Sequence, residues 1–198
     1  MTLMNRLLSG SAALTLAGFL ACSGGGGGST PPPPPPPPAP TATGLAYTDP
    51  ATGTYKLVKN ASSSTTHLVL DLVGPVGTGT GVSGTFSADT TKVTWANVAA
   101  GDPANTLVQN GTAFTLGAAP QILKGKATGN VLQATAAQKG TSSPVSLNAP
   151  LLRIALDLKA SQPLGAITLS ADATKCQVLD GAGTISIITV SVGTLTAN

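Results

Sequence analysis

Short apolar runs separated by glycine, asparagine, aspartate and proline fill the chain from Leu45 to its end. Within most of these runs apolar and polar residues alternate, which is typical of strands that bury one face. The pattern predicts eleven strands in this part of the chain: Thr54–Lys59, His67–Val73, Val82–Ser87, Lys92–Val98, Thr106–Gln109, Thr112–Leu116, Asn130–Ala137, Leu151–Lys159, Ala166–Ser170, Lys175–Leu179 and Thr184–Val192.

The alternation is clearest in residues 151–159, where Leu152, Ile154 and Leu156 share one face. The other face of this strand carries charged side chains, and we expect it to be solvated. In the last predicted strand the alternation changes phase between Ile187 and Ile188, which predicts a β-bulge at that point.

The spacing of the strands, roughly 8–15 residues from one to the next, favours a β-sandwich over units in which strands and helices alternate. Asn110-Gly111 lies between two apolar runs and predicts a two-residue hairpin, because a type I′ turn needs positive φ at both positions. The predicted fold class is all-β, a jelly-roll sandwich.

The first 22 residues have a different pattern. Arg6 precedes a mainly apolar stretch from Leu7 to Ala21, which is too short for a transmembrane helix of about 20 residues and is typical of a signal peptide. The sequence Phe19-Leu20-Ala21-Cys22 resembles the bacterial lipobox. This resemblance implies that residues 1–21 are removed and that Cys22 is lipidated. Ordinary signal cleavage nearby, with Cys22 incidental, is the alternative.

The residue after the cysteine bears on location. Lipoproteins that lack Asp at this position are typically sent to the outer membrane, and here the residue is Ser23. Two or three acyl chains give stable anchoring, whereas one chain is marginal. We therefore expect a cell-envelope protein that is anchored in outer-membrane lipid through Cys22 and lies in the periplasm or on the surface.

Residues 22–44 read as a linker between this anchor and a domain at 45–198. Five glycines, Gly24–Gly28, predict a flexible coil, and eight prolines, Pro31–Pro38, predict a polyproline II rod. In that conformation residues 31–40 would span about 31 Å. A proline-rich ligand for SH3-like domains would need a cytosolic partner, which conflicts with export.

The composition excludes several classes of function. Charged residues make up 9% of the chain, glutamate is absent, and there are one histidine and two cysteines. Neither a zinc site of His and Cys ligands nor an iron–sulfur cluster can be built from these residues. A formal net charge of +3 is too low for a nucleic-acid binder. We predict no cofactor and no metal centre, although a calcium ion on a single Asp turn stays open.

One eight-residue pattern occurs twice. Residues 85–92 read TFSADTTK and residues 168–175 read TLSADATK, identical at six of eight positions. Each copy places an aspartate, Asp89 or Asp172, in a turn after a strand, where its carboxylate can accept hydrogen bonds from backbone N–H groups. The copies are either one stable turn used twice or a matched pair of ligand-binding loops.

Two longer stretches resemble cohesin domains. Residues 81–101 are similar to their early strand pair, and residues 146–196 to the strands that close their sandwich. The resemblance spans residues 45–196 and implies a cohesin-like jelly roll with a protein partner, because cohesins hold dockerins. The chain has no dockerin-like repeat with an Asp-rich calcium loop, so such a partner would lie on another chain.

Catalytic motifs are weak. Residues 79–84 match GxGxxG, but a strand pattern follows where a dinucleotide site needs a helix. His67, the single histidine, begins an apolar strand, and Cys176 is expected to be a small buried side chain. Without glutamate, a catalytic carboxylate pair would have to come from aspartates in turns. We predict that the protein is not an enzyme.

Aromatic side chains are the candidates for a sugar-binding surface, since pyranose rings stack on flat rings. Tyr47 and Tyr55 are expected to be more exposed than Trp95, and a solvent-exposed pair among the three would favour a carbohydrate-binding module. The candidate ligand-binding residues are Tyr47, Tyr55, Trp95, Asp89 and Asp172. The predicted function is a non-catalytic surface lipoprotein that binds a protein or matrix partner, with carbohydrate binding as the alternative.

Overall fold

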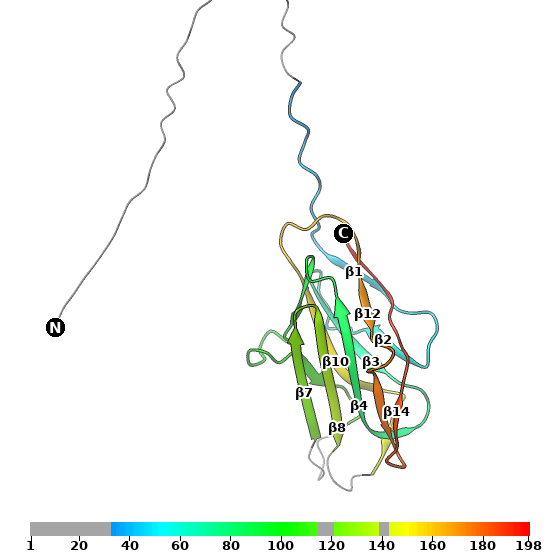
Figure 1. The fold of residues 1–198 in the computed structure, drawn as a ribbon. Coiled ribbons are helices and arrows are strands. Elements are labelled where there is room, and N and C mark those ends of the chain that lie inside the picture. Colours follow the sequence, from blue (N-terminus) through cyan, green and yellow to red (C-terminus); the bar gives the residue numbers. More distant parts are fainter. Residues whose placement is uncertain (1–32, 115–120, 139–142) are drawn as a thin grey trace, which may run out of the picture. The chain divides into compact units, whose positions relative to one another are not determined.

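The computed structural model describes residues 33–114, 121–138 and 143–198. Every regular element in these ranges is a strand, and the strands form a sandwich (Figure 1), which confirms the all-β prediction. The part of the chain described here contains no helix that is long and apolar enough to span a membrane. The predicted signal peptide and Cys22 lie outside the described residues.

One layer of the sandwich is a six-stranded sheet in which β10 occupies the centre. It pairs antiparallel with β3, β5 and β6, whereas β15 pairs parallel with β2 at the sheet edge. The strand order is β15-β2-β3-β10-β5, with β6 also on β10. Its strands are β2 (Tyr55–Lys59), β3 (His67–Val73), β5 (Val93–Ala96), β6 (Val108–Asn110), β10 (Pro150–Leu158) and β15 (Val190–Ser191).

The other layer is a seven-stranded sheet built on the long strand β4. Its order is β14-β13-β4-β8-β7, and β9 and β12 also pair with β4. Its strands are β4 (Thr78–Ala88), β7 (Gln121–Thr128), β8 (Val131–Gln138), β9 (Val145–Ser146), β12 (Leu169–Ala171), β13 (Gln177–Asp180) and β14 (Ile185–Ile187). The sequence pattern did not predict β7 or β9.

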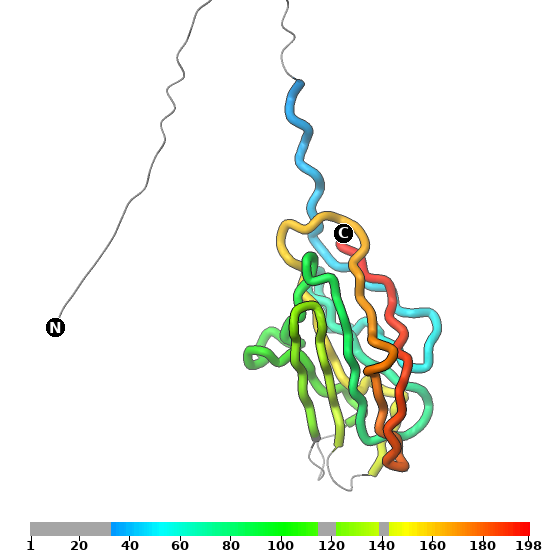
Figure 2. Tube along the Cα trace, in the orientation of Figure 1, coloured from blue at the N-terminus to red at the C-terminus, as the bar shows by residue number. Residues whose placement is uncertain are grey.

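A small third sheet closes the end of the sandwich where the chain enters. Its order is β1-β16-β11, with β1 at Leu45–Thr48, β11 at Gly165–Ile167 and β16 at Thr194–Ala197. The N–H groups of Thr43 and Gly44 donate to the carbonyl of Asn198 at 2.7 and 2.8 Å, so the start of the domain and the C-terminus lie together (Figure 2). The domain therefore takes in residues 41–44, which composition had assigned to the linker.

The core fills the space between the two large sheets. Leu68, Leu70 and Leu72 face inward from β3, and Phe86 and Leu132 face them from β4 and β8. Phe86 is fully buried, and truncation of such a ring to alanine costs about 3–5 kcal/mol. The largest fully buried side chains are Phe86, Phe114, Leu57, Leu68, Leu70, Leu72, Leu132, Leu151, Leu152, Ile154, Leu156 and Val69.

The predicted hairpin at Asn110-Gly111 is wrong. The N–H groups of Gly111 and Thr112 donate to the carbonyls of Leu151 and Pro150, so the chain continues beside β10 instead of turning. A Cβ at Gly111 would lie 1.9 Å from the Pro150 carbonyl oxygen, so glycine serves a close backbone approach here. Residues 112–114 form no strand, and the rest of the strand predicted at 112–116 lies outside the described residues.

The two-residue hairpin occurs instead at Gly129-Asn130, between β7 and β8. Thr128 pairs with Val131, and Gly129 has φ 59°, the sign that a type II′ turn requires at its first central residue. The phase change at Ile187–Ile188 is likewise no bulge. After Ile187 the chain leaves the seven-stranded sheet, and at Val190 it joins the six-stranded one.

Candidate functional site

The three aromatic candidates are core residues. Tyr47, Tyr55 and Trp95 keep 8%, 6% and 7% of their surface exposed. The hydroxyl of Tyr47 donates to the Leu57 carbonyl at 2.9 Å and accepts from the N–H of Gly193 at 2.7 Å, and the indole of Trp95 donates to the Asn130 carbonyl at 3.2 Å. The exposed aromatic pair that sugar stacking requires is therefore not formed by these rings.

The tyrosine hydroxyls are structural groups. Burial raises the pKa of Tyr47 to about 12, although the N–H of Gly193 partly offsets this by stabilising the phenolate. Burial also raises the pKa of Tyr55. Because Tyr47 of β1 bonds to Leu57 of β2, its hydroxyl ties the small sheet to the six-stranded one.

The repeated segments pair with each other. β4 and β12 run antiparallel with Ser87 opposite Ser170, and the N–H of each repeat aspartate donates to the threonine carbonyl at the start of the other repeat. The register therefore has a local twofold axis between the two serines. In an antiparallel pair the two turns fall at opposite ends, about 14 Å apart for Asp89 and Asp172. They do not converge on one ligand.

Each repeat aspartate is used inside its own turn. Oδ1 of Asp89 accepts from the hydroxyl and N–H of Thr91 at 2.5 and 3.0 Å, and Asp172 does the same with Thr174 at 2.8 and 3.0 Å. The Thr91 bonds lower the pKa of Asp89, whereas Lys175 and then Thr174 lower the pKa of Asp172 to about 2. Among the described residues no three His, Cys, Asp or Glu side chains gather as a metal site would require.

Cys176 is buried, as predicted, and its thiol lies 3.9 Å from the carbonyl of Thr85. Burial raises the pKa of this thiol, which keeps it protonated and unreactive. The residue packs as a small apolar side chain behind the second repeat.

His67 lies on the outer face of the six-stranded sheet, with both ring nitrogens bonded. Nδ1 contacts Oδ1 of Asp157 at 2.5 Å, and Nε2 contacts the carbonyl of Val98 at 3.1 Å. A histidine that acts as a general base needs a free nitrogen toward its nucleophile. Because both nitrogens face acceptors, the imidazole links the sheet to the loop at 97–107.

That loop covers the middle of the same face. Val98 packs on Val69 and Ala155 in a small second cluster, separate from the main core. Beside it the carboxylate of Asp71, which is 6% exposed, accepts from Arg153 at 2.9 Å and from Asn60 at 2.6 Å. The charged face of β10 is therefore paired and partly covered, not solvated as the alternation suggested.

The outer face of the seven-stranded sheet is different, because apolar side chains cross it in a line. Register places Ile185, Leu179, Gly81, Ala137 and Ile122 side by side on β14, β13, β4, β8 and β7. We call these five residues the aliphatic row. Ile185 is 66% exposed, and Ile187, which lies next to it on the same face, is 64% exposed.

A shallow pocket of about 130 Å³ lies within this row, between Leu179, Ile185 and Ala137. Gly81 forms its floor, and a Cβ there would lie 2.7 Å from the Cβ of Ala137. The pocket has the size of one aliphatic side chain. An exposed apolar surface with a central pocket is typical of a protein-binding face.

Sequence reasoning placed four of the row's five strands, all but β7, but did not single out the row. Alternation shows which residues share a face and does not show which face is buried, so it could not tell whether Ile185 and Ile187 face the core or water. The signal that could have found the site is the alternation in residues 121–128, which puts Ile122 on the same face as Lys124 and Lys126.

The two stacked sheets, with a parallel strand pair at one edge, define a cohesin-like jelly roll. No protein-family model and no curated protein matches the chain. Among solved structures it is similar to a type II cohesin in a cohesin–X-dockerin complex from Acetivibrio cellulolyticus, with a TM-score of 0.52 and 10% identity over 71% of this chain and 95% of that chain.

A second similar structure is the sixth cohesin of scaffoldin B from the same organism, in complex with a mutant Cel5 dockerin. Its TM-score is 0.50 and its identity 14%, over 72% of this chain and 97% of that chain. At such identities the likeness establishes the fold alone. It confirms the cohesin-like sandwich that residues 81–101 and 146–196 suggested.

Proposed function

We propose that the protein is a non-catalytic binding module that holds a protein partner on the aliphatic row. The observation that carries this proposal is the aliphatic row, in which Ile122 and Ile185 are exposed, together with its pocket beside Leu179. Burial of such a row against a complementary surface would contribute about 25 cal/mol per Å² of apolar area. The two similar cohesins were solved in complexes with dockerins, which supports a protein partner.

The proposal includes a lipid anchor on Cys22 and a position at the outer membrane. The lipobox-like sequence and Ser23 support it. Cys22→Ala should abolish incorporation of labelled palmitate and release the protein from the membrane fraction. A variant that stays membrane-bound would contradict the anchor without touching the binding proposal.

The binding proposal is tested by capture from an envelope extract with the chain from Ser23 onward. Leu179→Asp places a charge in the pocket and should abolish capture of the partner. Leu164→Asp is the matched control, because Leu164 is an exposed leucine, 47% accessible, at the end of the sandwich where the chain enters. Equal capture by the two variants would refute binding through the aliphatic row. Binding only to a polysaccharide array would favour the alternative function, carbohydrate binding.

A further inference from the structure

The seven-stranded sheet ends in a long free edge. β7 pairs with β8 over eight residues, and on its other side no described strand pairs with it. Residues 122–128 are all exposed. The outer edge of such a strand presents unpaired N–H and C=O groups, which another strand can use.

A groove runs along this edge. Its volume is about 650 Å³, and it lies between residues 123–126 of β7 and residues 105–108, which lead into β6 of the other sheet. Leu107, Val108 and Leu123 give it apolar walls. At Gly125 a Cβ would lie 2.6 Å from Cγ2 of Val108, so glycine lets the two sheets approach and sets the depth of the groove.

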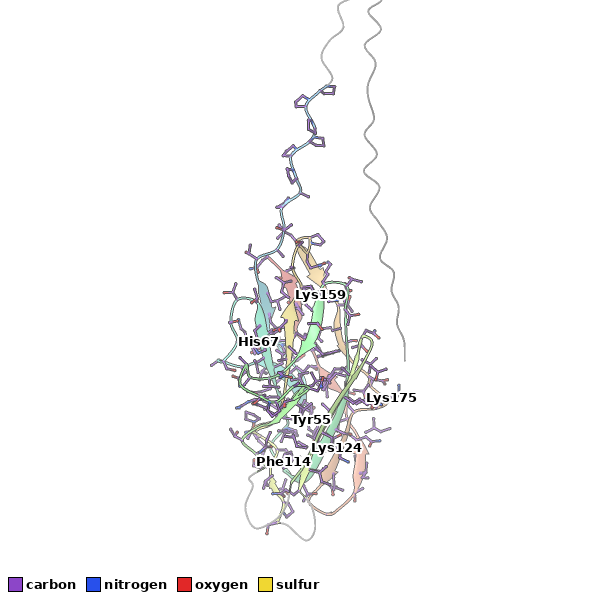
Figure 3. The ribbon with its side chains drawn as sticks, turned by 90° about the vertical axis from the view of Figure 1, so that its left-hand side faces the viewer. Tyr55, His67, Phe114, Lys124, Lys159 and Lys175 are labelled. Carbon is purple, nitrogen blue, oxygen red and sulfur yellow. The ribbon has the colours of Figure 1, made fainter. Side chains whose placement is uncertain are left out.

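The charged side chains beside the groove are positive. Lys124 and Lys126 lie on the outer face of β7, two residues apart, and neither takes part in an ion pair among the described residues (Lys124 is labelled in Figure 3). All seven acidic residues of the protein lie within the described ranges. Each of them is hydrogen-bonded to a group that lies outside β7. Complementary charge must therefore come from another molecule.

A second copy of this chain does not fit the edge. Two β7 strands paired antiparallel about Gly125 would set Lys124 of one copy opposite Lys126 of the other. Like charges directly opposite each other destabilise a strand pair, and lysines on sheet edges prevent self-association in this way.

We propose that the β7 edge binds an extended acidic segment of another protein as an additional strand. Backbone hydrogen bonds to β7 provide affinity, acidic side chains on one face meet Lys124 and Lys126, and small apolar side chains on the other face enter the groove beside Leu107 and Val108. This site shares only Ile122 of β7 with the aliphatic row and does not depend on the function proposed for the row.

The test uses the chain from Ser23 onward and an acetylated, amidated ten-residue peptide in which Asp and Val alternate. Saturable binding is expected, with NMR shift changes confined to β7 and residues 105–108. Lys124→Glu with Lys126→Glu should weaken it at least about tenfold. The matched control reverses the charges of Lys56 and Lys59 on β2 and should leave binding unchanged, as should Leu179→Asp.

Two further peptides separate strand addition from simple charge attraction. Each carries N-methyl groups on alternate residues, one on the odd and one on the even positions. A strand bonds to the edge through one set of its N–H groups, so one peptide should keep its affinity and the other should lose it. Equal binding by both peptides, equal binding by dextran sulfate at the same residues, or no binding at all would overturn the proposal.

Discussion

The two outer faces of the sandwich differ in whether their charged groups are paired within the chain. On the six-stranded sheet the charges satisfy one another: His67 bonds to Asp157, and Arg153 bonds to Asp71. A loop then covers the apolar positions between them. On the seven-stranded sheet the aliphatic row has no cover among the described residues, and Lys124 and Lys126 have no acidic partner there. Figure 3 shows His67 and Lys175 on opposite sides of the molecule.

This difference separates stability from binding. A face whose donors and acceptors are paired within the chain contributes little binding free energy, because a partner would first have to break those hydrogen bonds. A face that exposes apolar side chains to water contributes favourable binding free energy when a partner buries them. We therefore expect substitutions on the first face to lower the free energy of unfolding and substitutions on the second to leave it unchanged.

The largest effect is expected at the Asp71–Arg153 pair. Asp71→Ala leaves Arg153 and Asn60 without their acceptor and should lower the free energy of unfolding by about 2–4 kcal/mol, measured by urea denaturation. Asp71→Leu combined with Arg153→Met should recover most of that loss, because a buried ion pair can be replaced by apolar side chains. A loss below about 1 kcal/mol for Asp71→Ala would show that this face does not depend on the pair.

The next effect concerns His67, which links the six-stranded sheet to the loop at 97–107. His67→Ala removes the bonds to Asp157 and to the Val98 carbonyl and should cost about 1–2 kcal/mol. Amide hydrogen exchange should become faster in the loop and stay unchanged in β4 and β8. Thr66→Ala, an exposed neighbour, is the control. Faster exchange spread over both sheets would mean that His67 supports the whole fold and not the loop alone.

A smaller, pH-dependent effect is expected in the repeat turns. The pKa of Asp172 falls from its ordinary value of 3.8 to about 2 on folding, so its ionised form stabilises the turn. That contribution is complete above about pH 4 and disappears as the pH falls toward 2. The gap in unfolding free energy between the native chain and Asp172→Asn should therefore close over this range. If the difference in unfolding free energy stays constant with pH, the shape of the Asp172 side chain and not its charge causes the effect.

Much of the fold could be predicted because alternation has a period of two wherever a strand covers the core. β3 was predicted at its observed bounds, and β10 was displaced by one residue. The errors arose where a long-range contact decides the local structure. Gly111 looked like a turn residue, yet Pro150, far along the chain, explains why a glycine stands there.

The candidate site was harder to predict for a related reason. The chemistry of sugar stacking singled out the aromatic rings, and the repeated segment singled out the two aspartates. In the structure the rings fill the core and the aspartates close their own turns. Whether Ile185 faces the core or water depends on which sheet β14 joins, and that pairing is set by β13 and β4. Local pattern carries no information about it.

The smallest effect on stability, and the sharpest test of the comparison, is expected on the open face. Ile185→Thr with Ile187→Thr removes apolar surface that water already contacts, so the free energy of unfolding should change by no more than about 0.5 kcal/mol. The same variant should lose the partner that the native chain captures, because the pocket beside Leu179 loses one wall. If stability instead falls by more than about 2 kcal/mol, these isoleucines are core residues and the two faces do not differ as described.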